Sequence, residues 1–420
     1  MKILLVNQTF YPDVASTAQH AGDLAAQLVA SGHELTVVSS RRAYDNPQRI
    51  FPANEVWKGV RIRRIGSLGL GKTAKWRRAL DFASFLIRCT VQLALLPKFD
   101  VVIAMTSPPL VAFIASLFSS WKGGRLVYWV MDLNPDEALA AGWLRENSMA
   151  ARVLQRISNY TFRRSARVIV LDRFMKARVL EKGVDAAVID TIPPWSHDDA
   201  VQNDVGGREK FRREHGLEDK FVVMYSGNHS PCHPLESLVD AAQRLADRKS
   251  IAFCFIGGGS EHAKVRALAE ARGLGNVLCL PYQPIDRLSA SLNSADMHAV
   301  VMGNPFVGIV HPCKIYNVLR LGKPVLYIGP REGHIPDMVR SVLPCEWYYP
   351  AAHGEVDLIV EHILAASTRP PGDGADQKRI AADFSAHALL PQLAARIEFA
   401  GADSVATVKP RSAMEPTAFL

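Results

Sequence analysis

The sequence lacks the features of several other classes of protein. No stretch reaches eighteen uninterrupted apolar residues, so no segment is expected to span a bilayer. The first apolar run stops at Asn7, too short for the core of a signal peptide. No C-x-x-C pair occurs, which argues against a zinc site of that kind and against a disulfide framework. We therefore expect a cytoplasmic protein with reduced thiols. The cysteines are Cys89, Cys232, Cys254, Cys279, Cys313 and Cys345.

Acidic residues are fewer than basic ones, with 41 Asp and Glu against 49 Lys and Arg. The formal net charge is +8 and the pI about 9.2, which favours an anionic partner such as a phosphate ligand, a nucleic acid or an acidic lipid surface. Charge alone does not choose among the three.

One short motif suggests a nucleotide-hydrolysing enzyme. Residues 66–73, "GSLGLGKT", fit the G-x-x-x-x-G-K-[ST] pattern of a phosphate-binding loop. The run "VIVLD", ending at Asp172, could supply the acidic partner on the magnesium side. A pattern with four fixed positions also arises by chance, and the preceding "VRIRRI" has the charge of a half-exposed strand, whereas such loops follow buried ones. We therefore interpret residues 66–73 as a surface loop.

Strand-like runs alternate with helical stretches in two series, which predicts an α/β protein with two doubly wound, Rossmann-like domains. We expect an N-terminal domain over 1–195, a linker over 196–219 and a C-terminal domain over 220–377. A late helix over 378–400 is expected to return to the first domain, followed by a disordered tail over 401–420. The first helix can cap on Ser16 or Thr17 and should stop at Gly32.

Ligands of open α/β sheets bind at the carboxyl ends of the strands, so two such domains predict a site in the cleft between them. The first domain offers the loop Ala15, Ser16 and Thr17, and the turn "VMDLNPDEALAAG" with Asp132. The second offers "SGNHSPCHPLES", where Pro234 suits the first helical position, together with "IGGGSE" and "HPCKIYNVLRLGKPV". Lys314 and the helix starts would suit a diphosphate.

These blocks, in this order and spacing, resemble the GT-B glycosyltransferases of the group-1 (family four) class, nearest the branch that assembles bacterial O-antigen and capsule sugars. The resemblance runs from "KILLVNQTFYPD" through "VMDLNPDEALAAG" and "YSGNH" to "PCKIYNVLRLGKPVLYIG" and "DFSAHALLPQL". It implies the GT-B architecture, a nucleotide diphosphate-sugar as donor and co-substrate, and transfer with retention of configuration.

The resemblance also exposes departures from the family pattern. The family's paired glutamates, eight positions apart, are replaced by Ile309 and Asn317, so recognition of the donor must differ. The family's arginine and lysine near the diphosphate are replaced by Asn228 and His233. We expect His233 to gain a proton beside two phosphates and to act with Lys314 and the helix start at Pro234, and His229 either helps or is an exposed loop residue without a role.

The candidate residues follow from these loops. Asp132 is the acid/base or orienting candidate, with a turn-capping role as the alternative. The candidates for donor binding are Gly227, Asn228, His233, Gly257, Gly258, Lys314, Tyr316 and Asn317. No Asp-x-Asp pair occurs, so we expect metal-independent transfer without a cofactor, in which amides and cations stabilise the leaving group.

The leading hypothesis is a glycosyltransferase that acts on a surface polysaccharide or a lipid-linked acceptor, with no role for nucleic acid. The segment from Lys72 to Phe85 is basic around Trp76 and precedes an apolar helix. It either packs on the sheet with a solvated first turn or lies on an anionic membrane surface at the inner face of the plasma membrane. The alternatives are a catalytically silent relative that binds a nucleotide sugar or a partner, a nucleotide-sugar epimerase, and a nucleotide hydrolase built on residues 66–73.

Overall fold

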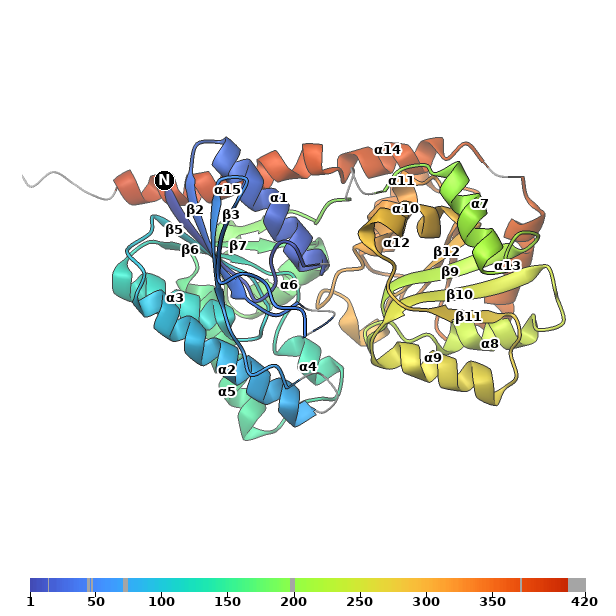
Figure 1. Ribbon diagram of the computed structural model, residues 1–420, viewed down its shortest axis with the longest axis horizontal. Helices are drawn as coiled ribbons and strands as arrows, with labels where there is room; N and C mark the ends of the chain where they lie inside the picture. Colours follow the sequence, from blue (N-terminus) through green and yellow to red (C-terminus); the bar gives the residue numbers. More distant parts are fainter. Residues whose placement is uncertain are drawn as a thin grey trace, which may run out of the picture. The chain divides into compact units, whose positions relative to one another are not determined.

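The computed structural model describes residues 1–13, 15–43, 46, 48–70, 75–196, 201–370 and 372–406 (Figure 1). The chain divides into two compact units: unit 1 contains Met1–Trp129, Tyr160–Ile169 and Gln392–Leu420, and unit 2 contains Val130–Asn159 and Val170–Pro391. This division differs from the expected linker at 196–219, because residues 130–159 and 170–195 pack with the C-terminal series. For example, the Leu133 amide donates to the Ile309 carbonyl at 2.8 Å, and Arg178 Nε donates to the Val307 carbonyl at 2.7 Å.

The first sheet has eight strands in the order β3-β4-β2-β1-β5-β6-β7-β8. Their bounds are β1 Lys2–Val6, β2 Glu34–Ser40, β3 Asn54–Trp57, β4 Val60–Ile65, β5 Val101–Ala104, β6 Arg125–Trp129, β7 Arg167–Val170 and β8 Ile189–Thr191. The central strands are apolar and buried from Ile3 to Val6 in β1 and throughout β5, as expected for parallel strands covered on both faces. β3 pairs with β4 in the antiparallel sense and was not predicted from the sequence.

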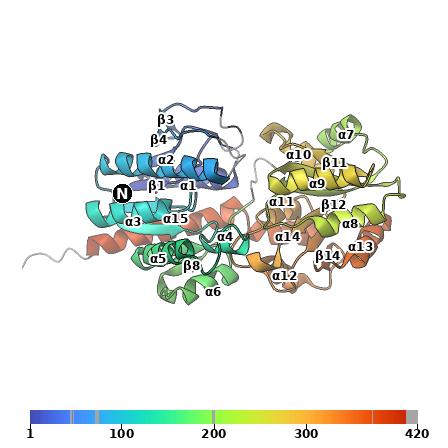
Figure 2. The ribbon, with the colours of Figure 1, turned by 90° about the horizontal axis from the view of Figure 1, so that it is seen from below.

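Helices cover this sheet on both faces. Figures 1 and 2 show α2 (Lys75–Ala94) and α3 (Val111–Lys122) on one face, and α1 (Ser16–Ala30) and α15 (Ala386–Ala406) on the other. The N-cap of α1 is Ala15 and makes no side-chain bond, so the expected cap on Ser16 or Thr17 is wrong; the Thr17 hydroxyl instead bonds Thr9 at 3.0 Å. Because α15 continues to Ala406, residues 401–406 of the expected tail are helical, and 407–420 lie outside the described residues.

The second sheet is entirely parallel in its recorded pairs, in the order β11-β10-β9-β12-β13-β14. Its strands are β9 Phe221–Asn228, β10 Ile251–Gly258, β11 Val277–Leu280, β12 Met297–Val301, β13 Val325–Ile328 and β14 Tyr348–Ala351. Alternate residues of β9 enter different cores: Tyr225 joins the core beneath α8, whereas Met224 joins the core beneath α7.

The remaining helices surround this sheet or connect the two series. They are α4 Asp136–Ala140, α5 Met149–Arg164, α6 Arg173–Glu181, α7 Val205–Glu214, α8 Glu236–Arg244, α9 Ser260–Ala271, α10 Ile285–Asn293, α11 Lys314–Arg320, α12 His334–Val339, α13 Val356–Thr368 and α14 Ala375–Asp383. Short 3₁₀ turns cover Ala186–Val188, Asn304–Phe306 and Arg340–Val342.

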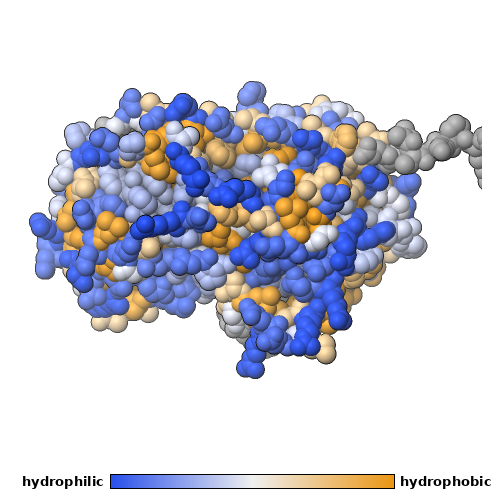
Figure 3. Space-filling model, turned by 180° about the vertical axis from the view of Figure 1, so that it is seen from behind, coloured by the Kyte–Doolittle hydropathy of each residue, from blue (hydrophilic) through white to orange (hydrophobic). Residues whose placement is uncertain are grey.

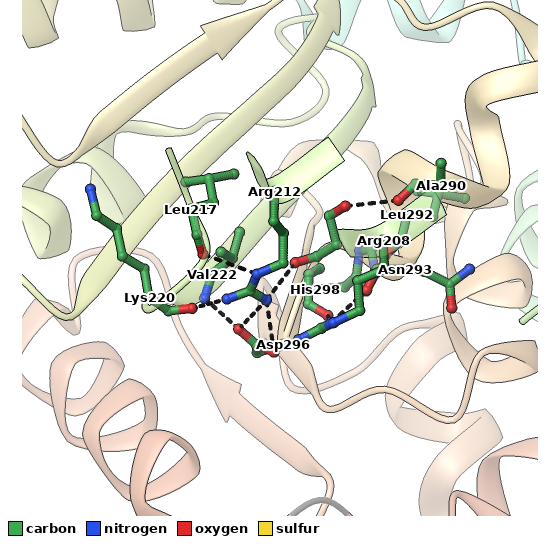
Figure 4. Close-up of polar contacts among 12 residues, drawn as sticks. Arg208, Arg212, Leu217, Lys220, Val222, Ala290, Leu292, Asn293, Asp296 and His298 are labelled. Atoms are coloured by element: carbon green, nitrogen blue, oxygen red, sulfur yellow. Dashed lines mark hydrogen bonds and ion pairs between the residues drawn. The ribbon is translucent and has the colours of Figure 1, made fainter. Parts of the chain in front are cut away.

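A buried arginine attaches α7 to the second sheet (Figure 4). The Arg212 side chain is 8% exposed and donates to Asp296 Oδ2 at 3.0 Å, to the Leu217 carbonyl at 3.0 Å and to the Ser294 carbonyl at 3.1 Å. Arg208 donates to the same carboxylate at 2.6 Å. Burial opposes ionisation of Asp296, but these hydrogen bonds outweigh it and hold its pKa below the usual value. Helix α7, which lies within the expected linker, is therefore attached to the second sheet.

The surface carries apolar side chains mainly as separate patches among polar ones on the face shown in Figure 3. Among the described residues, no helix combines the length and the hydropathy needed to cross a bilayer.

Candidate functional site

Two glycine-containing strand ends lie against each other at the carboxyl edge of the second sheet. Gly227 in β9 pairs with Gly257 in β10, and the His229 amide donates to the Gly258 carbonyl at 2.9 Å. A β-carbon on Gly257 would lie 2.0 Å from the Gly227 carbonyl oxygen, and its φ of +139° is one that L-residues rarely adopt. Glycine is therefore required at Gly257 for the two strand ends to approach this closely.

Lys314, the first residue of α11, reaches this edge. Its Nζ lies 3.6 Å from the centre of the Tyr225 ring, and 3.4 Å from where a β-carbon on Gly227 would stand. The amine is shut off from solvent and has no hydrogen-bond partner among the described residues. Burial lowers its pKa from 10.5 to about 7. A buried amine without a counter-ion is the arrangement expected where an anionic ligand supplies the missing partner.

The two histidines beside Lys314 are buried and neutral. His233 Nδ1 lies 2.7 Å from the Val301 carbonyl, and His229 Nδ1 lies 2.9 Å from the Gly227 carbonyl. Burial, followed by the charge of Lys314, lowers the pKa of each to about 3. Without a ligand His233 is therefore neutral, its protonation beside two phosphates stays a prediction, and His229 is buried, so it is not an exposed loop residue. A carbonyl-bonded, neutral ring offers its other nitrogen as an acceptor.

The start of α8 also differs from the expectation. The helix begins at Glu236 with Leu235 at its N-cap, so Pro234 precedes the helix and does not occupy its first position. Glu236 in the first turn of α8 makes this helix end less suited to an anion, because the carboxylate repels it.

Asp132 follows β6 and belongs to unit 2 with the residues above. Burial, followed by the charge of Glu137, raises its pKa to about 8, so the carboxyl group is largely protonated at neutral pH. The next helix, α4, has Pro135 at its N-cap, which makes no side-chain hydrogen bond. A protonated carboxyl group can donate a hydrogen bond to a sugar or acceptor oxygen.

Comparison with known proteins identifies the family. A model described as "Glycosyl transferase 4-like domain" matches residues 17–195, and one described as "Glycosyl transferases group 1" matches residues 207–333. The chain belongs to the group-1 glycosyltransferases. It is 28% identical over 344 residues to WcaI of Escherichia coli (strain K12), named as a colanic acid biosynthesis glycosyl transferase, covering 77% of this chain and 82% of the relative. It is 23% identical over 346 residues to WbjE of Pseudomonas aeruginosa, named as a glycosyltransferase, covering 80% and 83%. These relatives support the branch that makes bacterial surface polysaccharides.

Solved structures confirm the GT-B architecture of this glycosyltransferase. Sucrose-phosphate synthase from Thermosynechococcus elongatus matches with a TM-score of 0.72 at 15% identity, over 96% of this chain and 100% of that one. HepE of Anabaena, solved with UDP-glucose, matches with a TM-score of 0.63 at 14% identity, over 97% and 100%.

The two positions at which the family has glutamates, Ile309 and Asn317, have different surroundings in this glycosyltransferase. Ile309 is buried, and its carbonyl accepts from the Leu133 amide. Asn317 lies in α11, one turn after Lys314. Ile309 offers no polar side chain, so only Asn317 keeps hydrogen-bonding capacity at these positions.

Two residues near the glycine loops add to the expected set. The Tyr282 ring would be 3.0 Å from a β-carbon on Gly258, and its hydroxyl lies 3.4 Å from the Gly258 carbonyl and 3.5 Å from Asn228 Oδ1. Cys232 Sγ lies 3.9 Å from Glu137 Oε1. In the sequence, neither Tyr282 nor Cys232 belongs to a recognisable motif, and Cys232 is noticeable only because it lies between His229 and His233.

A polar cluster also escaped sequence reasoning. Asp172, His311 and His334 each offer one ligand atom within 4.8 Å of the others, the group among the described residues that could hold a metal ion. His311 Nδ1 lies 2.8 Å from Asp172 Oδ2, and the Tyr316 hydroxyl lies 2.6 Å from His311 Nε2 and 2.9 Å from His334 Nε2. The Tyr316 side chain thus belongs to this cluster rather than to the glycine edge.

The residues of unit 1 give two further observations. Of the loop candidates, Ala15 and Thr17 are half-buried and Ser16 is exposed. In the surface loop, the Gly69 amide donates to Asp81 Oδ1 at 2.6 Å and the Leu68 amide donates to Ser84 Oγ at 3.1 Å. The Gly69 amide is thus already paired with a carboxylate, and β4 alternates buried and exposed residues from Val60 to Arg63. Lys72 and Thr73 lie outside the described residues.

Proposed function

We propose that this glycosyltransferase transfers a sugar from a nucleotide diphosphate-sugar to a surface-polysaccharide or lipid-linked acceptor, with retention of configuration and without a metal. The observation that carries the proposal is the unpaired Nζ of Lys314 beside Gly227. HepE, a structural neighbour, was solved with UDP and with UDP-glucose, which supports a donor of this class. The name of the E. coli relative supports a polysaccharide acceptor.

Lys314 and Asp132 would have separate roles in the transfer. A diphosphate next to Nζ favours the ammonium form, so donor binding would be accompanied by uptake of a proton at Lys314. The resulting charge would stabilise the diphosphate as the sugar leaves. Asp132, protonated at neutral pH, would orient the sugar or the acceptor by donating a hydrogen bond.

A thermal-shift titration with UDP, GDP and UDP-, GDP- and dTDP-sugars tests the donor. We expect one nucleotide series to stabilise the wild type and Lys72→Ala equally and Lys314→Ala much less, since a ligand at 100 times its Kd adds about 2.7 kcal/mol. Stabilisation by ATP or GTP that Lys72→Ala abolishes would instead support the nucleotide hydrolase.

Turnover of the selected donor separates an enzyme from a silent relative. Product formation that persists in EDTA, with the anomeric configuration determined by NMR, would support retention and metal independence. Binding without transfer or hydrolysis would favour the silent relative. Asp132→Asn keeps a hydrogen-bond donor and should retain more activity than Asp132→Ala; equal losses would point to a base instead.

We also propose that α2 binds an anionic membrane surface, which would bring the enzyme to a lipid-linked acceptor at the inner face of the plasma membrane. Of the expected segment, Lys72 lies outside the described residues, and Phe85 is buried and does not face solvent. The exposed apolar face begins at Trp76, 60% exposed, and continues through Leu80, Ile87 and Val91 to Leu95, the residue after the helix. Spacings of four and seven place these side chains in one stripe, with Arg77 over the Trp76 ring.

A further inference from the structure

The cluster around Tyr316 joins three separate parts of unit 2. Asp172 occupies the N-cap of α6 and accepts from the Met175 amide at 2.8 Å. His311 lies in the loop before α11, Tyr316 lies within α11, and His334 begins α12. The hydrogen bonds run from Asp172 to His311, from His311 to Tyr316 and from Tyr316 to His334.

Each of these side chains already has a partner within the cluster. Burial opposes ionisation of Asp172, but the hydrogen bond and charge of His311 outweigh it and hold the pKa of Asp172 low. Burial raises the pKa of the Tyr316 hydroxyl, which stays protonated and can donate to one histidine while accepting from the other. A metal ion would have to displace at least two of these bonds. The arrangement therefore favours a hydrogen-bonded support over a metal site.

The cluster lies on the opposite side of α11 from the Lys314 amine. Residues two apart in a helix point about 200° apart, so Tyr316 and Lys314 leave α11 in nearly opposite directions. On one side Tyr316 bonds His311 and His334 and stacks on Phe384, with ring centres 4.8 Å apart. On the other side Lys314 reaches Tyr225 and Gly227.

An amine held away from water needs its backbone fixed, because any rotation of α11 that exposed Nζ would restore its hydration. The helix has only seven residues and cannot supply this rigidity alone. We propose that Asp172, His311 and Tyr316 are positioning residues that hold α11 so that Lys314 presents its amine to the donor diphosphate, an inference that rests on the proposed function. Asp172 acts through His311, and His311 acts through Tyr316.

NMR of the Lys314 Cε in ¹³C-lysine-labelled protein tests the positioning without any ligand. The resonance is assigned with Lys314→Arg, and its titration is compared in wild type, Tyr316→Phe and Asp172→Asn. We expect Lys314 to titrate near pH 7 in the wild type and at least one pH unit higher in both variants, as the amine gains access to water. His298→Gln, which removes another buried histidine bonded to a carbonyl at 3.0 Å, is the matched control and should leave the titration unchanged.

UDP affinity measured by calorimetry completes the test. We expect Kd to rise about tenfold in Tyr316→Phe and to be unchanged in His298→Gln, with no further rise when Tyr316→Phe is added to Lys314→Ala. An unchanged Lys314 titration in both Tyr316→Phe and Asp172→Asn would overturn the positioning role. The positioning role would also be overturned if Tyr316→Phe weakened UDP binding equally in the wild type and in Lys314→Ala. Stoichiometric zinc in the purified protein that His334→Ala removed would overturn it too. Failure of the wild type to bind any nucleotide while the titration still shifts would refute the proposed function and leave the positioning intact.

Discussion

Replacing Lys314 with methionine should stabilise the ligand-free protein while removing its affinity for the donor. Methionine has a similar length and no charge, so it can fill the same space beside Tyr225 without the cost of burying an amine. An opposite effect on stability and on binding is the signature of a residue kept for function.

The size of the effect follows from the pKa of Lys314, which is about 7 in the folded protein against an ordinary value of 10.5. At pH 7 the unfolded chain binds the proton more tightly, and this difference destabilises the folded state by about 4 kcal/mol. As pH rises toward 10.5 the unfolded amine also loses its proton, so at pH 9 the penalty falls to about 2 kcal/mol. These values are upper limits for the gain on substitution, since methionine also loses the contact of the amine with the Tyr225 ring.

Chemical denaturation of wild type and Lys314→Met at pH 7 and pH 9, without nucleotide, measures this difference. Lys314→Met should be the more stable protein at pH 7, with a smaller advantage at pH 9. Lys249→Met, an exposed lysine in the same unit, serves as the control and should change stability by less than about 0.5 kcal/mol. A Lys314→Met protein that is less stable at pH 7, or whose advantage grows with pH, would refute a buried, neutral amine.

Three further outcomes can be checked directly. The Kd of the wild type for UDP should rise up to about tenfold per pH unit above pH 7, because the Lys314 amine must then take up a proton on binding. The Kd of Lys314→Met should not depend on pH in this range. Calorimetry in two buffers measures both the Kd and the proton uptake. Arg212→Met should lower the free energy of unfolding in urea by about 3 kcal/mol because it breaks a buried network. Arg213→Met, at the exposed neighbour, should lower it by less than about 0.5 kcal/mol. Equal losses would contradict the structural role of Arg212. Ile87→Glu with Val91→Glu should abolish flotation with anionic vesicles and leave thermal stability unchanged, and persistent flotation would exclude α2 as the membrane surface.

Most of the fold could be predicted because its signals are local. The two expected series of alternating strands and helices are present, since buried parallel strands are continuous apolar runs that few other structures tolerate. Strands β3 and β14 escaped prediction. β3 is an edge strand whose alternation is visible only beside β4, and β14 carries Pro350, which weakens a strand signal.

The candidate site could be predicted in composition but not in chemistry. The sequence placed Lys314, Gly227 and Gly257 together because they follow strands of one sheet, whose carboxyl ends share an edge. It did not reveal that His233 is buried between the Val301 carbonyl and Lys314, which keeps the ring neutral without a ligand. It also placed Tyr316 at the donor, although its hydroxyl turns to His311 and His334.

The sequence by itself determined the two α/β series, the family and the loops that carry the candidate site, because periodicity and block order are properties of neighbouring residues. Only the tertiary structure decided which side chains are charged. Burial of Lys314, the raised pKa of Asp132 and the pairing of Asp172 with His311 depend on residues far apart in the chain. Protonation follows from the solvent and charges that folding brings to a group, and these contacts do not exist until the chain is folded.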